Sequence, residues 1–226
     1  MILSSIMLIL KNLFIMVGET MFYVKSIAYL LGMNICFIGA ALMVKANLGT
    51  GTWTAFFAGL EHQFGLTIGF WYGFIQFILI FVNAWLFKRK PSLSPVLPLV
   101  LEALLFDFWL EIVFQSFTMG GHLFIEKVAV FVLGLALTSL GVAIYMTVGF
   151  PNAPRDDLFL AISQRFHKSI RFAQTSISFV ATSSALLLGG PVFIGTFISL
   201  CFYGQLIQFW TLLSSKTWRK LSHTLA

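Results

Sequence analysis

The chain has 226 residues, of which 59% are hydrophobic and 10% charged, and its formal net charge is +6. A water-soluble domain carries about 25% charged residues, and a disordered chain is poor in aromatic residues, so both classes are excluded. Apolar runs of membrane-spanning length indicate a helical integral membrane protein instead, in which basic residues mark cytoplasmic loops rather than a nucleic-acid surface.

The first 25 residues are predicted to form an interfacial helix. Four polar residues recur at seven-residue spacing and so share one helix face: Ser4, Ser5, Lys11 and Asn12. A polar stripe on an otherwise apolar segment is typical of a helix that lies in the membrane interface. A short extra span and a later start of translation are left open as alternatives.

Six further segments approach the ~20 residues that a helix needs to cross a hydrocarbon core of ~30 Å. They are 26–44, 69–88, 94–115, 126–148, 170–188 and 192–213. Two short helices, 53–64 and 154–166, are predicted, and each follows in the sequence a loop rich in Gly, Pro and Asn. At 1.5 Å per residue each is only about 18–20 Å long, which is too short to cross. They suit re-entrant half-helices, whose irregular entry backbone must be shielded by protein or water.

The two halves of the chain repeat one another. At an offset of 102 residues, Gly39 aligns with Gly141. After a shortened connection, Pro95 aligns with Pro191 at an offset of 96. The order of elements also recurs: span, broken loop, short helix, span, span. The expected organisation is an interfacial segment (1–25), two membrane repeats (26–115 and 126–213) and a cytoplasmic tail (214–226).

Positive charge decides how the two repeats are oriented. If the short helices do not cross, each repeat has three crossings and the second copy is inverted. With Arg155 set aside, eleven Lys and Arg residues then lie on the cytoplasmic side and two lie outside. If the short helices do cross, nine lie on the cytoplasmic side and four lie outside. We therefore expect six transmembrane helices in two inverted-topology repeats, in a bacterial inner membrane, with both termini cytoplasmic.

Two motifs resemble the YczE/YyaS/YitT-like bacterial membrane proteins. The first is GAALMVKANLGTGTW, from Gly39 to Trp53, and the second is Pro154-Arg155-Asp156. The family patterns are close to Leu-Gly-x-Gly-Pro-Trp-Asp and Gly-Pro-Arg-Asp. This chain departs from them at Thr52, Thr54 and Ala153. The resemblance covers about 26–213 and implies a multi-span bacterial inner-membrane protein, from a largely uncharacterised family that passes on no activity.

The segment from Asn152 to Asp157 holds the main candidate site. Pro154 suits the first position of a helix, whereas a cation there opposes the helix dipole, so Arg155 needs an acid, carbonyls or an anionic ligand. It is either part of an ion pair that locks the loop or a clamp for an anion. Trp53, its counterpart in the first repeat, is an interfacial anchor or an aromatic wall of a site. The candidate substrate-binding residues are Asn47, Trp53, Asn152, Arg155 and Asp156.

Two acids lie deep in the third span. An unpaired ionised carboxylate at this depth is energetically unfavourable. Glu102 or Asp107 is therefore protonated, paired with a partner or in contact with water. They are interpreted as ion-pair partners of Arg155 or as acids that couple a proton or cation, and the two roles are compatible. In the second span, Gln76 and Asn83 share a helix face and are expected to join helices.

The sequence has no nucleophile elbow, P-loop, nucleotide fingerprint or metal-ligand spacing, so an enzyme is disfavoured and no cofactor or metal is expected. Broken helices in inverted repeats favour a secondary transporter of a small solute or ion. The alternative is a non-transporting membrane scaffold or accessory factor for a partner complex. The expected partners are the lipid bilayer and a small solute or ion, with no nucleic acid, and a homo-oligomer is left open.

The expected topology is tested by cysteine labelling in a background without Cys36 and Cys201. Lys90→Cys and Lys220→Cys should react with an impermeant maleimide only from the cytoplasmic side, and Gly120→Cys only from outside. Labelling of position 120 from the cytoplasm would overturn the inverted-repeat topology.

Overall fold

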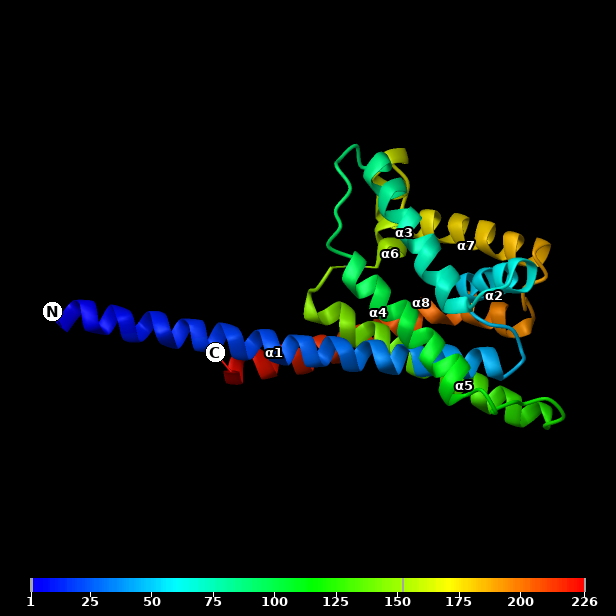
Figure 1. Ribbon diagram of the computed structural model, residues 1–226, viewed down its shortest axis with the longest axis horizontal. Coiled ribbons are helices and arrows are strands. Elements are labelled where there is room, and N and C mark those ends of the chain that lie inside the picture. The colour runs from blue at the N-terminus through cyan, green and yellow to red at the C-terminus, as the bar shows by residue number, and fades with distance from the viewer. Residues whose placement is uncertain (1, 152, 226) are drawn as a thin grey trace.

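The computed structural model describes residues 2–151 and 153–225, and its regular structure within these ranges is entirely helical. The elements are α1 (Ile2–Lys45), α2 (Thr52–Phe64), α3 (Ile68–Leu86), α4 (Val96–Asp107) with a π-helical continuation η1 (Phe108–Val113), α5 (Phe124–Val148), α6 (Pro154–Phe166), α7 (Ile170–Leu187) and α8 (Ile194–Leu225). As the chain proceeds, α1, α4 and α7 run from left to right in Figure 1, and α3, α5 and α8 run from right to left.

Four helical segments of the described residues are long and apolar enough to cross a membrane. They are Met21–Lys45, Ile68–Leu86, Phe124–Val148 and Ile194–Thr217. The third expected span is divided into α4, of 12 residues, and η1, of 6 residues. The fifth expected span is the 18-residue α7, whose segment Phe172–Leu187 is an apolar helix of less than spanning length. Length and composition therefore support crossing for four of the six expected spans.

The first helix does not stop where the interfacial segment was expected to end. α1 runs without a break for 44 residues, through the boundary expected at residue 25. The physical reason is that no proline interrupts residues 2–45, so nothing removes a backbone hydrogen bond there. Figure 1 shows the N-terminal part of this helix projecting beyond the other elements.

The two short helices lie within one residue of their expected bounds, and each has 13 residues. The chain is turned before α2 by Gly49, which has a φ of 97° that other residues rarely adopt. Before α6 it is turned by Gly149, with a φ of 83°, and Pro154 then occupies the first helical turn. The breaks that separate each short helix from the preceding long helix are therefore local features of the sequence.

α1 and α5 pack against each other through four glycines. A Cβ placed on Gly32 would lie 3.0 Å from the carbonyl oxygen of Gly141, and one on Gly134 would lie 2.7 Å from that of Gly39. A Cβ on Gly39 or Gly141 would collide with backbone atoms of the opposite helix. Small residues allow this close approach of two apolar helices. The contact is reciprocal, because the earlier glycine of each helix meets the later glycine of the other.

The remaining helices pack around this pair. α2 lies against α7 and α6 lies against α3, so each short helix contacts the helix that follows the other short helix. α5 also packs on α8, and α3 packs along α4. Segments from both halves of the chain are therefore interleaved.

Replacing the contact glycines should destabilise the protein. Gly39→Ala and Gly141→Ala insert a methyl group where backbone already lies, and such overpacking costs about 1–3 kcal/mol. We expect the midpoint of thermal unfolding in detergent to fall by several degrees. Gly204→Ala in α8 is the matched control, because a Cβ there meets nothing within 4 Å. Alanine also favours helix by about 1 kcal/mol over glycine, so a stable Gly39→Ala protein would contradict the tight contact.

Candidate functional site

A cavity of about 410 Å³ lies where the two short helices begin. Gly51, Trp53 and their neighbours line it from the start of α2, and Arg155 and Asp156 line it from the first turn of α6. The rest of the wall comes from α1, α3, α4, α5, α7 and α8. The starts of two short helices that are about a hundred residues apart in the sequence therefore face the same space.

The start of α2 is held by residues from the other half of the chain. The backbone N–H of Gly195 donates to the Leu48 carbonyl at 2.7 Å, and the N–H of Thr50 donates to Thr196 Oγ1 at 3.2 Å. A Cβ on Gly49 would lie 2.8 Å from the same Thr196 Oγ1, so only glycine allows this approach. The loop before α2 thus depends on the first turn of α8 for its hydrogen bonds.

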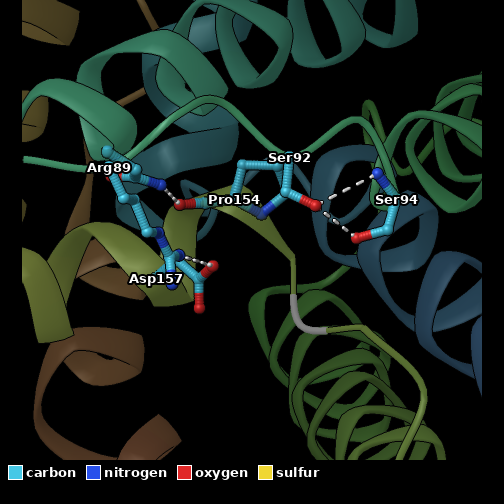
Figure 2. A network of polar contacts seen from close by, with 6 residues as sticks. Arg89, Ser92, Ser94, Pro154 and Asp157 are labelled. Carbon is cyan, nitrogen blue, oxygen red and sulfur yellow. Dashed lines mark hydrogen bonds and ion pairs between the residues drawn. The ribbon is translucent and has the colours of Figure 1, made fainter. Parts of the chain in front are cut away.

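The start of α6 is held by α3. Asn83 Nδ2 donates to the Pro154 carbonyl at 2.7 Å, and the backbone N–H of Arg155 donates to Gln76 Oε1 at 3.1 Å. Arg89, just after α3, lies 3.8 Å from Asp157 as an ion pair. Figure 2 shows Arg89 and Asp157 pointing toward each other beside Pro154. The expected role of Gln76 and Asn83 as joining groups is thereby confirmed.

Arg155 does not pair with either deep acid. Its Nε lies 3.6 Å from Asp156 Oδ1, and no other acid of the described residues is within 4 Å of its guanidinium. Its side chain is 18% exposed and lines the cavity. The expectation that Glu102 or Asp107 forms an ion pair with Arg155 is therefore wrong, because both acids have other partners.

Glu102 lies directly behind the cavity wall. It is 2% exposed, and it accepts a hydrogen bond of 2.9 Å from the hydroxyl of Tyr72. Tyr72 lines the cavity and Glu102 does not. The Tyr72 hydroxyl therefore connects the cavity with a buried carboxyl group.

Asp107 has a structural position instead. Its carboxylate accepts hydrogen bonds from Thr67 Oγ1 at 2.5 Å and from the backbone N–H of Gly69 at 2.7 Å. These bonds satisfy a donor at the beginning of α3 and join that helix to the end of α4. Asp107 is not part of the cavity lining. Its hydrogen bonds join α3 to α4, and we call this contact the Asp107 clasp.

The other expected site residues divide as follows. Trp53, Arg155 and Asp156 line the cavity, whereas Asn47 is exposed at the end of α1 with a φ of 55° and is not part of the lining. Asn152 lies outside the described residues. Three tyrosines that the sequence did not indicate as site residues line the cavity from three different helices: Tyr72, Tyr145 and Tyr203. Their only signal in the sequence is a hydroxyl group inside an apolar run.

Comparisons with known proteins place these features in a family. Residues 23–212 match the model described as "Family of unknown function (DUF6198)", which confirms the resemblance to YczE/YyaS-like proteins. The uncharacterized protein YyaS of Bacillus subtilis is 32% identical over 184 residues, covering 81% of this chain and 90% of that protein.

Two further relatives are similar over most of their length. The uncharacterized membrane protein YczE of Bacillus subtilis is 27% identical over 182 residues, which is 80% of this chain and 82% of that protein. An uncharacterized protein of Haemophilus influenzae is 30% identical over 186 residues, covering 82% and 83%. No solved structure matches the chain.

The contact between α3 and α6 is tested by Gln76→Leu. Leucine removes the acceptor of the Arg155 N–H, and an unsatisfied buried donor costs about 1–3 kcal/mol. Thermal unfolding in detergent should therefore shift downward by several degrees. Phe77→Leu, at an exposed position of the same helix, should leave the midpoint within about a degree of the wild-type value. Equal stability of the two variants would contradict the anchoring role.

Proposed function

The chain belongs to the family of unknown function DUF6198, and we propose that it is a secondary transporter of a small solute or ion in the bacterial inner membrane. The observation that carries the proposal is the cavity between the starts of two short helices from opposite halves of the chain. Transporters built from inverted repeats bind their substrates at such a junction, where interrupted helices present free backbone groups.

The glycine contacts between α1 and α5 support an inverted repeat. At the offset of 102 residues, Gly32 corresponds to Gly134 and Gly39 to Gly141. Each contact pair, Gly32 with Gly141 and Gly39 with Gly134, is therefore converted into the other when the two halves are exchanged. Such reciprocity is the property of a contact across a two-fold axis. The exchanged packing of α2 on α7 and α6 on α3 follows the same relation.

The directions of the helices support six crossings. The elements α1, α3, α4 with η1, α5, α7 and α8 alternate in direction along the chain (Figure 1). The 13-residue α2 and α6 come between them in the sequence. Six crossings place both termini on one side of the membrane. The excess of positive charge assigns that side to the cytoplasm.

An asymmetry between the halves supports alternating access. α3 packs along α4, where a Cβ on Gly73 would lie 3.1 Å from the Ala103 side chain. The corresponding helices α7 and α8 do not pack along each other in the described part of the chain. Two repeats that can exchange their packing would open the same site to opposite sides of the membrane in turn. The Asp107 clasp would then be one of the contacts that hold the α3–α4 side closed.

We propose Glu102 as the coupling acid. It is buried in an apolar helix, its hydrogen-bond partner is a hydroxyl group rather than a cation, and that partner, Tyr72, lines the cavity. Intramembrane acids in such positions carry protons in transporters. Asp107 lacks this access to the cavity, so we assign it no coupling role.

The scaffold alternative is less well supported. A scaffold has no use for an internal space, and its centre would be filled by packed side chains. Here the space between the starts of the two short helices has room for a small molecule and is lined by hydroxyl, amide and charged groups as well as apolar ones.

Blocking the cavity should abolish transport. Gly51 lines the cavity with a φ of −60°, and a Cβ there would meet only Thr54 Oγ1, at 3.8 Å. Gly51→Phe should therefore place a ring in the cavity with little strain. In proteoliposomes screened with labelled amino acids, organic anions and simple cations, we expect wild-type protein to take up at least one compound. Gly51→Phe should reduce that uptake at least tenfold.

Gly51→Ala is the matched control, because it adds only the Cβ and should keep most of the uptake. Uptake no greater than that of protein-free vesicles for every compound class would contradict the transporter and favour the scaffold. Unchanged uptake by a folded Gly51→Phe protein would show that the solute does not pass through this cavity.

A further inference from the structure

The groups that line the cavity indicate which class of solute it takes. Resting on the proposed function, we propose that the cavity binds a small organic anion, a carboxylate with an apolar body, between Arg155 and the first turn of α2.

Arg155 has donors to offer to such a ligand. Within the described residues its single ion-pair contact is the one to Asp156, made through Nε at 3.6 Å, and its two terminal nitrogens make no hydrogen bond. The side chain lines the cavity. A guanidinium binds a carboxylate best through two parallel N–H groups, and the fork of terminal nitrogens is the part that remains unused here.

The first turn of α2 supplies a second set of donors. Its N-cap, Gly51, has no side-chain cap. In the described chain the backbone N–H groups of Thr52, Trp53 and Thr54 make no hydrogen bond, although these three residues line the cavity. The N-terminus of a helix carries about half a positive charge and attracts anions. The start of α6 is different, because its N–H groups already bond to Gln76 and to the Ala153 carbonyl.

The acids near the site leave this attraction in place. Asp156 lies in the first turn of α6, where the helix dipole favours a negative charge, and it balances Arg155 while no ligand is bound. An incoming carboxylate would compete only with the long Nε contact. Glu102 is not part of the cavity lining, and it accepts a hydrogen bond from Tyr72, which is part of that lining.

The rest of the lining suits the apolar part of the ligand. Aromatic rings from six helices surround the space: Phe37, Trp53, Tyr72, Phe106, Tyr145 and Tyr203. Cavities that hold small organic ligands begin at about 300 Å³, and this one has about 410 Å³. A single inorganic ion would leave most of that volume and the aromatic surface without contact.

Binding is tested with pairs of compounds that differ in charge but little in shape. The full-length protein in neutral detergent is heated with benzoate, phenylacetate or hexanoate, and with benzamide, phenylacetamide or hexanamide. We expect at least one carboxylate to raise the unfolding midpoint by about 3 °C or more, as ligand binding to the folded state does, and its amide to have no effect. Phenylalanine, which adds an ammonium group to the same frame, should also have less effect than its matching carboxylate.

Substitutions on α6 connect the shift to the site. Arg155→Gln should abolish the shift of the unfolding midpoint. Arg155→Lys keeps the positive charge and the loop structure but lacks the two parallel N–H groups of the guanidinium, so it should reduce the shift. Arg165→Gln is the matched control, because Arg165 is exposed in the last turn of the same helix. If Arg155→Gln does not fold, the comparison of Arg155→Lys with Arg165→Gln decides the question.

Several results would overturn the inference: no shift with any carboxylate, an equal shift with the amide, a larger shift with phenylalanine, or a shift that survives in Arg155→Gln or stays full in Arg155→Lys. Uptake of the same compounds separates this inference from the proposed function. Carboxylate binding without uptake would uphold the anion site and contradict transport. Uptake of a neutral or cationic solute without carboxylate binding would uphold transport and overturn the anion site.

Discussion

The close approach of α1 and α5 is the contact on which the rest of the structure depends. Four glycines allow the two backbones to meet, because none of them carries a side chain that would hold the helices apart. The two helices run in opposite directions, and each leads into a turn and a short helix. The chain therefore leaves this pair at opposite ends on its way to α2 and to α6.

Interrupting a helix in an apolar environment leaves backbone groups that need partners. Each loop finds them in the other half of the chain: Thr196 serves the loop before α2, and Gln76 and Asn83 serve the start of α6. Because each half holds the broken backbone of the other, the two helix starts stay together around one cavity. Not all donors are used in this way, and those that remain unpaired at the start of α2 are the ones that face the cavity.

The charged and acidic groups at the centre of the fold also have their own separate partners. Arg155 contacts the acid next to it in the sequence, while Glu102 is bonded to a tyrosine and Asp107 to a threonine and a backbone amide. Among the described residues, therefore, no buried ion pair between helices closes the cavity. A guanidinium that is not held by a second helix remains available to a ligand, which is what the proposed anion site requires.

Composition and local sequence determined the membrane class and the bounds of both short helices. Each depends on residues close together in the chain, such as Gly149 with Pro154, which end one helix and begin the next. They also placed Trp53 and Arg155 at the two helix starts. The partners of the deep acids were decided only by the tertiary structure, because rotation and depth of one helix against another determine whether Glu102 meets Tyr72 or Arg155. The same holds for the cavity, since Tyr72, Tyr145 and Tyr203 come from three helices whose sequences do not reveal that they share a wall.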